Sequence, residues 1–426
     1  MDLIERLPTP WGLVRLGVAP DHPKIKEVSR AFEKIAARPG FRFLGNVELG
    51  RDLTPGDLAR LYDAVVYAVG AQTDRRLGIP GEDLPGSWPA TAFVAWYNGH
   101  PDFQDLSFDL SGERAVVIGN GNVAVDVARM LALTAEELAP TDTTGAAIEA
   151  IVGSGIREIL MLGRRGPVQG AFTTPELVEL GELAGADAVV DPAELDLDTA
   201  SAAELEAGTP IQRRNLDVLR ELAARTPAGR PKRLHLRFRV SPVAILGDDR
   251  VEAIEVVRNE LVPDGRGSVR AVPTEEREVI PCGIVLRSVG YRGVAVSDVP
   301  FDEGRATIRN AGGRVLDEQG IAVPGAYCAG WIKRGPTGVI GTNKKDATET
   351  VELLLADARS GALPRAANAS AAAVDALLAE RGGEVVTYSG WEMIDRLECE
   401  RGASCGRPRI KVCRWEELLA ASRRTA

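Results

Sequence analysis

Residues 115–129 read AVVIGNGNVAVDVAR, and this stretch decides the fold of the middle of the chain. An apolar strand runs directly into Gly119, Asn120 and Gly121, and a helical pattern follows at once. In a dinucleotide-binding unit the first glycine makes the tight turn, the second lets the backbone approach a pyrophosphate, and a small residue such as Ala124 lets helix and strand pack closely. The amides of residues 122–125 then face the anion. The pattern predicts a dinucleotide site at Gly119, Asn120, Gly121, Asn122, Val123 and Ala124.

A second strand indicates which dinucleotide is bound. It reads EILMLGRRGP over residues 158–167 and ends in Arg164 and Arg165. A site for NAD carries an acidic residue here, which binds the ribose hydroxyls. Two guanidinium groups suit the 2′-phosphate of NADP, whereas an acid would repel it. We therefore expect NADP, with Arg164 and Arg165 as ligands of its 2′-phosphate.

Length and composition fit a two-domain α/β enzyme. The chain has 426 residues, 45% of them hydrophobic, with 45 glycines and 26 prolines. A chain of this length is too long for one hydrophobic core. It contains no apolar run of about eighteen residues, and the opening MDLIERLPTP lacks the basic and apolar segments of a signal peptide. These features predict a cytoplasmic protein without a membrane span.

The cysteines and the charge exclude several classes of site. The five cysteines are scattered without a CxxC pair, so a zinc site, an iron–sulfur cluster or a redox disulfide lacks its ligands. We expect no metal, and any electron transfer must use a bound organic cofactor. The net charge of −10 argues against nucleic acid as a general partner.

The order of the elements indicates a discontinuous domain. The strand YDAVVYAVG over residues 62–70 closes on a glycine, and GIVLRSVGYRG over residues 283–293 repeats that character. Because two such strands bracket the nucleotide unit, we expect one of the two domains to be discontinuous: residues 1–72 and 288–426 belong to it, and residues 73–287 form the other. Further expected elements are a helix over 24–37, a strand over 41–47, an insert over 134–155 and a β-meander over 234–270.

A second glycine-rich helix entry, GPTGVIG, lies at residues 335–341. The amides of Gly338, Val339 and Ile340 are expected to point at the pyrimidine end of a flavin, where negative charge accumulates on reduction. Trp331 precedes this entry, and its side chain is expected to pack against the flavin. From the residues alone, a glycine-rich helix entry without a ligand remains the alternative.

Four stretches follow one another along the chain: PTPWGLVRLGVAPDHPK (8–24), GNGNVAVDVAR (119–129), GRRGPVQGAFTTPEL (163–177) and GWIKRGPTGVIGTNKKDA (330–347). Together they resemble the adrenodoxin-reductase-like ferredoxin–NADP reductases, particularly the actinobacterial ones, and the last stretch is very specific. The resemblance runs from residue 2 to the carboxyl terminus. It implies a flavoprotein oxidoreductase that holds FAD and NADPH in two doubly wound domains and passes electrons from NADPH through FAD to a one-electron ferredoxin.

The resemblance also implies individual cofactor contacts. One acid matches the residue that holds the FAD ribose hydroxyls, two leucines match backbone contacts to the flavin nucleotide, and three residues match NADP contacts. These are Glu5, then Leu13 and Leu49, then Arg75, Glu176 and Gly338, beside Asn120–Val123 of the first glycine motif.

His22 and Glu179 are the family's candidates for shaping the encounter of nicotinamide and flavin. His22 stands between Asp21 and Pro23 in a loop, so it is not on a helix face. A purely structural histidine is the alternative. Because hydride transfer depends mostly on positioning, we expect replacement of His22 to slow the reaction without abolishing it.

The helix IQRRNLDVLRELAAR over residues 211–225 carries a candidate docking surface for the protein partner. It is expected to present an exposed basic stripe of Arg213, Arg214, Arg220 and Arg225. Because ferredoxins are acidic, such a stripe would steer one despite the negative net charge of the chain. An ordinary solvated helix face is the alternative.

The amino terminus departs from the family. The family's chain opens with a strand, a GxGxxA-type finger and a helix that clasp the FAD pyrophosphate, whereas Met1 falls in what should be the second strand. About 35 residues of a βαβ unit are expected to be absent, which leaves the FAD domain truncated. Either the true start lies upstream, or the chain is a shortened relative with impaired FAD binding. The leading hypothesis is the NADPH-dependent ferredoxin reductase. One rival is a non-catalytic NADPH-binding remnant. The other is a flavin disulfide reductase or a glutamate-synthase-like subunit, which is disfavoured because it would need a CxxC or clustered cysteines.

Overall fold

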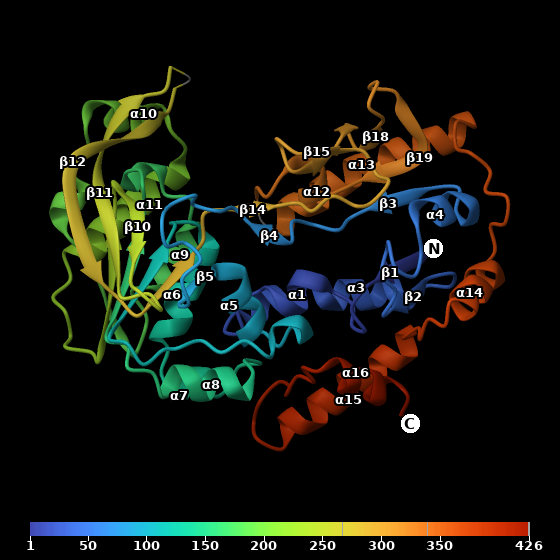
Figure 1. Ribbon diagram of the computed structural model, residues 1–426, viewed down its shortest axis with the longest axis horizontal. Helices are drawn as coiled ribbons and strands as arrows, with labels where there is room; N and C mark the ends of the chain where they lie inside the picture. The colour runs from blue at the N-terminus through green and yellow to red at the C-terminus, as the bar shows by residue number, and fades with distance from the viewer. Residues whose placement is uncertain (266, 339, 425–426) are drawn as a thin grey trace.

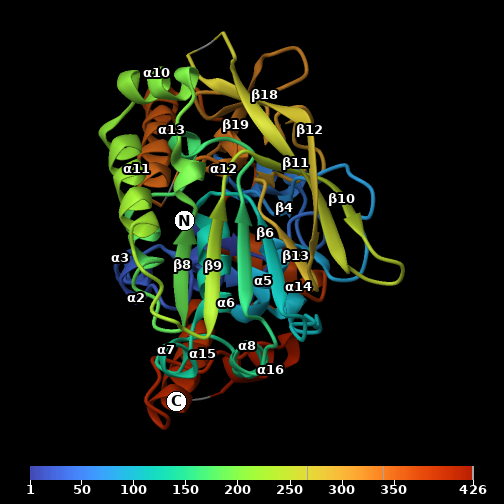
Figure 2. The ribbon, with the colours of Figure 1, turned by 90° about the vertical axis from the view of Figure 1, so that its left-hand side faces the viewer.

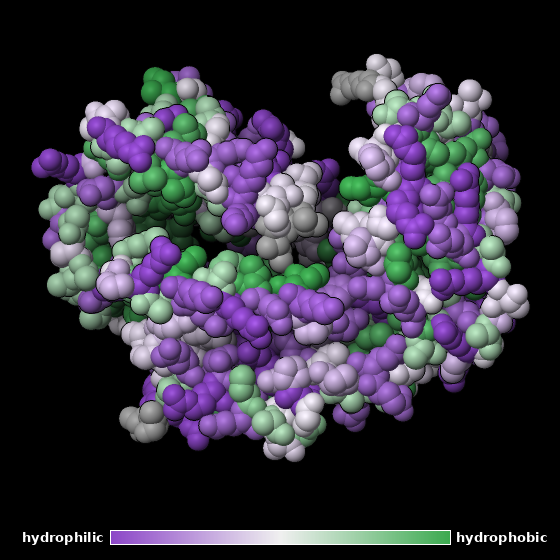
Figure 3. All heavy atoms as spheres, turned by 180° about the vertical axis from the view of Figure 1, so that it is seen from behind, coloured by the Kyte–Doolittle hydropathy of each residue, from purple (hydrophilic) through white to green (hydrophobic). Residues whose placement is uncertain are grey.

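The computed structural model describes residues 1–265, 267–338 and 340–424, and these residues form two lobes (Figure 1). The first lobe is built on a six-stranded sheet, and the second on a two-stranded and a four-stranded sheet. Seen from behind, the surface has a notch between the lobes that opens at the top (Figure 3). No helix within the described ranges is long and apolar enough to cross a membrane.

The sheet of the first lobe is parallel throughout (Figure 2). Its order is β5 (Ser87–Pro89), β13 (Ile284–Arg287), β6 (Arg114–Ile118), β7 (Glu158–Leu162), β9 (Lys232–Arg237) and β8 (Ala186–Val190). Strands of this kind are continuous apolar runs because both faces of a parallel sheet are covered. This explains why RAVVI and EILML carry no polar alternation.

Alternate side chains of these strands pack into two separate hydrophobic cores, one on each face of the sheet. Ala115 and Val117 pack against helices α5 (Ala90–Tyr97), α6 (Asn122–Ala132), α9 (Thr174–Glu179) and α11 (Pro210–Ala223). Val116 and Ile118 pack instead against a three-stranded antiparallel sheet. The sheet is therefore sandwiched between helices and a second sheet, and its carboxyl edge is positioned from both sides.

The expected β-meander over 234–270 is wrong in its first strand. Residues 234–237 belong to β9 of the parallel sheet, because Leu234 and Leu236 pack into the helical core. Arg239 has a positive φ of 56° and turns the chain away from that sheet. The antiparallel sheet consists of β10 (Val240–Leu246), β11 (Ala253–Pro263) and β12 (Val269–Pro281).

The second lobe combines segments from both ends of the chain. Strand β1 (Asp2–Glu5) pairs in parallel with β2 (Arg42–Gly45), near the expected strand at 41–47. Strand β3 (Val65–Tyr67), shorter than expected, pairs in parallel with β19 (Ala322–Cys328), which continues to β18 (Arg314–Leu316) and β17 (Asn310–Ala311). The helix expected over 24–37 is divided into α2 (Pro23–Lys26) and α3 (Ser29–Ala36).

The chain crosses between the lobes along two adjacent segments. Strand β4 (Thr73–Asp74) pairs antiparallel with β14 (Tyr291–Arg292), so the outgoing and returning connections lie side by side.

The insert at 134–155 forms α7 (Ala135–Leu138) and α8 (Gly145–Val152). The other elements are α1 (Gly12–Leu16), α4 (Pro55–Leu61), α10 (Thr199–Ala207), α12 (Trp331–Arg334), α13 (Ile340–Ser360), α14 (Ala371–Glu380), α15 (Tyr388–Ala403), α16 (Trp415–Ser422), β15 (Phe301–Asp302), β16 (Thr307–Ile308), and short 3-10 helices at 101–103, 167–169 and 192–195.

Candidate functional site

The turn from β6 into α6 has the geometry that the glycine motif predicts. Gly119 has φ 132°, and a Cβ there would lie 2.2 Å from the carbonyl oxygen of Ser288, so only glycine fits. At Gly121, the residue before α6, a Cβ would meet only the Cβ of Ala171 at 4.0 Å. The protein itself therefore does not require glycine at 121, which agrees with close approach of a ligand at that position.

The first turn of α6 is held by the neighbouring chain. The side-chain oxygen of Asn122 accepts a hydrogen bond of 2.7 Å from the amide of Thr173, and Ala171 donates its amide to the carbonyl of Asn120 at 3.0 Å. Ala124 is fully buried, as close helix packing requires. Val123 is partly buried against the same core. The amides of this turn are thus fixed above the carboxyl end of β6.

Arg164 and Arg165 follow β7, which is adjacent to β6 in the sheet, so they lie at the same edge as the glycine turn. Hydrogen bonds fix the backbone of both residues. The side-chain amide of Asn259 donates to the carbonyl oxygen of Arg164 at 2.9 Å. The backbone amide of Arg239 donates to the carbonyl oxygen of Arg165 at 2.9 Å. Among the described residues neither guanidinium forms an ion pair. Arg75 is exposed and also forms no ion pair with a described residue. Its backbone amide donates to the carbonyl oxygen of Gly290 at 2.9 Å. Three cations are therefore available to an anionic ligand.

The candidate flavin side lies in the second lobe. Trp331 begins α12, its ring lies 5.2 Å from that of Tyr291, and its indole nitrogen is buried without a described hydrogen-bond partner. Gly338 has φ 80°, and a Cβ there would clash with the side chain of Thr342 at 2.6 Å. Helix α13 begins at Ile340, whereas the expected contact at Val339 lies outside the described residues.

The contacts expected near the flavin nucleotide occupy different environments. Glu5 ends β1 and accepts a hydrogen bond of 3.0 Å from the amide of Leu7. Burial raises the pKa of Glu5 despite that hydrogen bond. Leu13 is exposed on α1, and Leu49 is half-buried beside Leu53. A half-buried carboxyl group that lacks an ion pair in the described part of the chain suits the hydroxyls of a ribose.

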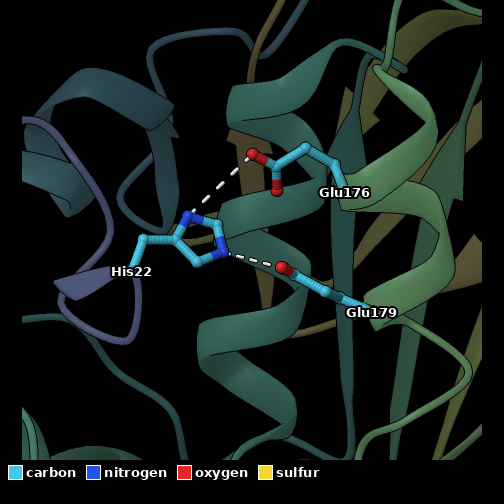
Figure 4. Close-up of side chains that lie close together, drawn as sticks. All are labelled: His22, Glu176 and Glu179. Carbon is cyan, nitrogen blue, oxygen red and sulfur yellow. Dashed lines mark hydrogen bonds and ion pairs between the residues drawn. The ribbon is translucent and has the colours of Figure 1, made fainter. Parts of the chain in front are cut away.

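His22 and Glu179 are brought together, as Figure 4 shows. The Nε2 atom of His22 lies 2.7 Å from Oε2 of Glu179, and its Nδ1 lies 3.9 Å from Oε1 of Glu176 and 3.9 Å from Oδ1 of Asp126. His22 comes from the chain between β1 and β2, whereas the acids lie on α6 and α9 of the first lobe. The cluster therefore connects the two lobes.

Arg129 on α6 completes this cluster and carries most of its hydrogen bonds. Its guanidinium contacts Asp21 at 2.9 Å, Asp126 at 2.8 Å and Glu176 at 3.3 Å, and it also bonds Glu179. Sequence reasoning missed Asp21, Asp126 and Arg129. The available signal was the pair Asp126 and Arg129, which stand three positions apart inside the glycine motif and so share a helix face.

Burial and the neighbouring charges shift the pKa values of His22, Asp126 and Glu179. Burial lowers the pKa of His22, but its hydrogen bond to Glu179 and the charges of Asp126 and Glu176 outweigh that effect and raise it above the usual value. Burial and the nearby charge of Glu176 raise the pKa of Asp126 to about 7, against the effect of Arg129. The hydrogen bond from His22 lowers the pKa of Glu179.

His22, Glu176 and Glu179 also have ligand atoms within 4.8 Å of one another, close enough for a metal ion. However, Arg129 already bonds both glutamates. The guanidinium therefore already neutralises part of the carboxylate charge on which a metal ion would depend.

The arginines of α11 are exposed, as expected, but they stand among acids. Arg214 pairs with Glu221 at 2.9 Å, and Arg220 lies 3.8 Å from Asp217. Arg213 donates to the carbonyl of Gly208 at 2.6 Å. Arg225, expected on the same helix, lies beyond the end of α11 at Ala223 and donates to the carbonyl of Gly181 at 2.7 Å. The surface is a mixed one with a basic excess.

All five cysteines are free thiols, and Cys328 ends β19 just before the Trp331 segment. Residues 17–157 match the family model described as pyridine nucleotide-disulphide oxidoreductase. No cysteine lies in that stretch of the sequence. The match therefore concerns the nucleotide-binding fold and carries no disulfide chemistry.

Close relatives match nearly the whole chain. It is 52% identical over 423 residues to the NADPH-ferredoxin reductase FprA of Mycobacterium tuberculosis, covering 98% of this chain and 91% of the relative. It is 43% identical over 437 residues to the human mitochondrial NADPH:adrenodoxin oxidoreductase, covering 98% and 86%. A solved structure of M. tuberculosis FprA in complex with NADPH matches with a TM-score of 0.92 at 52% identity, covering 99% of this chain and 92% of that chain. The chain belongs to the family of adrenodoxin-reductase-like ferredoxin–NADP reductases.

Proposed function

We propose that this protein is an NADPH-dependent flavoprotein reductase that passes electrons from NADPH through FAD to a ferredoxin-type iron–sulfur protein. The observation that carries the proposal is the edge of the parallel sheet, where a glycine turn with no steric need for Gly121 lies beside Arg164 and Arg165. An anionic dinucleotide with a 2′-phosphate fits both features. The names of the relatives support the same activity.

The residues of the first lobe bind the pyridine nucleotide in this proposal. The amides of Asn122 and Val123 face the pyrophosphate, and Arg164 and Arg165 hold the 2′-phosphate. Arg75, at the crossing between the lobes, supplies a third cation. Glu176, on α9, bonds Arg129 and so belongs to the charged cluster as well as to the expected NADP contacts.

The residues of the second lobe hold the flavin. FAD, when bound, accepts two electrons from NADPH and releases them one at a time, which a ferredoxin requires. The amino terminus of α13 and Trp331 would hold the isoalloxazine, and Glu5 would accept hydrogen bonds from ribose hydroxyls. His22 and Glu179 join the two lobes and would keep a proton available for the reaction.

We also propose the domain division on which this assignment depends. Residues 1–72 and 288–426 form the FAD domain, and residues 73–287 form the NADP domain. The pairing of β3 with β19 and the adjacent crossing strands β4 and β14 support these boundaries.

The FAD domain lacks one strand of its sheet in this proposal. Strand β1 pairs only with β2, and β3 pairs only with β19, among the strands that the structure describes. Both free edges carry exposed apolar side chains: Leu3 is 38% exposed and Val66 is 39% exposed. We propose that a parallel strand joins the two pieces and continues into the glycine finger that holds the FAD pyrophosphate.

The docking surface for ferredoxin is proposed at Arg213, Arg214 and Arg220. Their exposure supports the proposal, and the acids Asp217 and Glu221 limit the basic excess. Steering by such a surface needs only a local charge difference, so it is compatible with the net charge of −10.

The test of the function is an assay with two electron acceptors. Flavin-loaded protein should reduce ferricyanide with NADPH and should reduce cytochrome c only when a ferredoxin is added. A protein that binds NADPH but loads no flavin and reduces neither acceptor would be the non-catalytic remnant. The match over 98% of the chain to a ferredoxin reductase favours the enzyme over that alternative.

A further inference from the structure

Arg129 lies about two helical turns along α6 from its nucleotide-facing end at Asn122. It is 2% exposed, and its side chain leaves the helix on the same face as Asp126, three residues earlier. A buried guanidinium needs partners for its charge and its donors, because burying an unpaired ion is very costly. The partners therefore show what the residue does.

The partners of Arg129 come from three segments of the chain. Asp126 is on its own helix, Glu176 and Glu179 are on α9, and Asp21 is in the loop before α2. Asp21 and Arg129 are 108 residues apart in sequence, and the contact joins the loop between β1 and β2 to the first lobe. One side chain thus ties the loop that carries His22 to the helix that carries the glycine turn.

Arg129 acts on His22 through its partners. It bonds Glu179, which is also the hydrogen-bond partner of His22, and it holds Asp21, the residue next to His22. Its positive charge also lowers the pKa of His22, opposing Glu179, Asp126 and Glu176. Both the place and the charge state of His22 therefore depend on Arg129.

The geometry requires a guanidinium. The planar fork of arginine presents five donors, enough to serve three segments at once. A lysine places a single ammonium and would satisfy only some of the four carboxylates. Lysine at this position should therefore restore the charge without restoring the full set of contacts.

We propose that Arg129 is a positioning residue of the reductase, which clamps the Asp21–His22 loop to helices α6 and α9 and so sets His22 for the reaction between the two lobes. This inference rests on the proposed function for its kinetic consequences. Its structural part concerns only the charged cluster and is testable without turnover.

The kinetic test uses flavin-loaded protein with Arg129→Gln, Arg129→Lys and Asp21→Asn. We expect R129Q to slow single-turnover reduction of the flavin by NADPH about ten- to hundred-fold, because small displacements at a reacting pair have effects of that size. R129K should recover part of the rate. The affinity for NADP⁺, measured by calorimetry, should change by less than about three-fold, since Arg75, Arg164 and Arg165 hold the phosphate separately.

A matched control removes another arginine of the same lobe. Arg114 pairs with Glu158 between β6 and β7, at the opposite, amino-terminal end of these strands from the glycine turn. R114Q should leave flavin reduction unchanged. If R129Q does not fold, D21N tests the same Arg129–Asp21 contact from the partner residue. Asp21 is partly exposed, so its replacement should disturb the fold less.

The second readout is the titration of His22 itself. The chain has three histidines, so side-chain NMR signals of selectively labelled protein can be assigned with His22→Gln. Titratable or charged groups face His22 from α6, α9 and its own loop, namely Asp126, Arg129, Glu176, Glu179 and Asp21. Loss of the Arg129 charge should raise the pKa of His22 further, whereas R129K should leave it near the wild-type value.

The outcomes separate the two proposals. If R129Q and D21N both reduce flavin within about three-fold of the wild type, or if the His22 titration does not move in R129Q, the positioning role is wrong. If the wild-type flavoprotein transfers no electrons from NADPH, the proposed function is wrong, and the titration still decides whether Arg129 controls His22.

Discussion

The Nε2 atom of His22 lies 2.7 Å from Oε2 of Glu179, although the two residues are 157 positions apart in the chain. The contact joins the segment between β1 and β2 to helix α9 of the other lobe. It is an ion pair only while His22 is protonated. The association of the two lobes at this point is therefore coupled to pH.

The first prediction follows from the sign of that coupling. Because the pKa of His22 is raised in the folded protein, the pair contributes stability that is fully present below the ordinary histidine pKa of about 6.5 and is lost as the pH rises through the raised value. We expect the rate of flavin reduction by NADPH to fall in the same window. H22Q should react more slowly at low pH and should lack this limb of the profile. The rate of flavin reduction is measured by stopped-flow absorbance as a function of pH. An unchanged pH profile in H22Q would mean that another group causes the pH dependence.

The second prediction concerns cofactor choice. Each charged hydrogen bond to the 2′-phosphate is worth about 1.5–3 kcal/mol, and Arg164 and Arg165 have no ion-pair partner to compete for them in the described structure. Replacing both with glutamine should lower kcat/KM for NADPH by two or more orders of magnitude, as about 3–6 kcal/mol implies. NADH, which lacks the phosphate, should be nearly unaffected. A variant that kept its preference for NADPH would show that the 2′-phosphate binds elsewhere.

The third prediction concerns the partner surface on α11. Charge reversal at Arg213, Arg214 and Arg220 should weaken ferredoxin-dependent cytochrome reduction, most strongly at low salt, because steering is screened by ions. Ferricyanide reduction should be spared, since a small acceptor needs no docked protein. Reversal of three exposed arginines near the carboxyl terminus, Arg359, Arg401 and Arg424, is the matched control. Equal loss with both acceptors would point to damage of the fold or the flavin site.

The fourth prediction concerns a buried contact between the carboxyl-terminal segment and the first lobe. Asp142 contacts Lys26 at 2.6 Å and Lys411 at 3.0 Å, and both Asp142 and Lys411 are 6% exposed. Asp142→Asn leaves the buried ammonium of Lys411 and the half-buried ammonium of Lys26 without their counter-ion, which should cost about 3–5 kcal/mol of unfolding free energy. Denaturant unfolding measures the loss.

The matched control for Asp142 is Asp105. It pairs with Arg414 at 2.8 Å on the surface, in the same region of contact. Exposed pairs contribute little, so Asp105→Asn should leave the unfolding midpoint nearly unchanged. Similar stability of the two variants would mean that Lys26 and Lys411 lose their charge or find other partners when Asp142 is neutralised.

The glycine turn and the arginines beside it could be located from the sequence because each directly follows a strand. Gly119 and Gly121 follow one strand and Arg164 follows the next, and the carboxyl ends of adjacent parallel strands meet at one edge of a sheet. The strand at 234–237 was assigned wrongly for a related reason. Alternating Leu234 and Leu236 fit an antiparallel meander as well as the last strands of the parallel sheet, and only the turn at Arg239 separates the two.

The charged cluster was not predictable in full. His22 and Glu179 were found through resemblance, but nothing in the local sequence indicates that Asp21 meets Arg129, 108 residues away. The same applies to Lys411 and Asp142, which come from segments far apart in the chain. Contacts between lobes depend on how the lobes are packed, and hydrophobic periodicity carries no information about that.

The last prediction concerns the sheet of the second lobe, where β1 and β3 each have a free edge. A parallel strand at the centre of such a sheet is covered on both faces, and the helix after it supplies amides to a pyrophosphate. Without that strand, Leu3 and Val66 stay exposed, and unpaired apolar edges promote aggregation. We therefore expect the sheet to be completed by a further parallel strand that joins β1 to β3 and leads into a glycine finger. A chain extended by such a strand and finger should bind FAD stoichiometrically without added cofactor, with flavin absorbance at about 450 nm, whereas residues 1–426 should need an excess of added FAD to load and should aggregate more readily. Stoichiometric FAD in the 426-residue chain would overturn this prediction, and it would require a second cradle for the pyrophosphate that the described residues do not show.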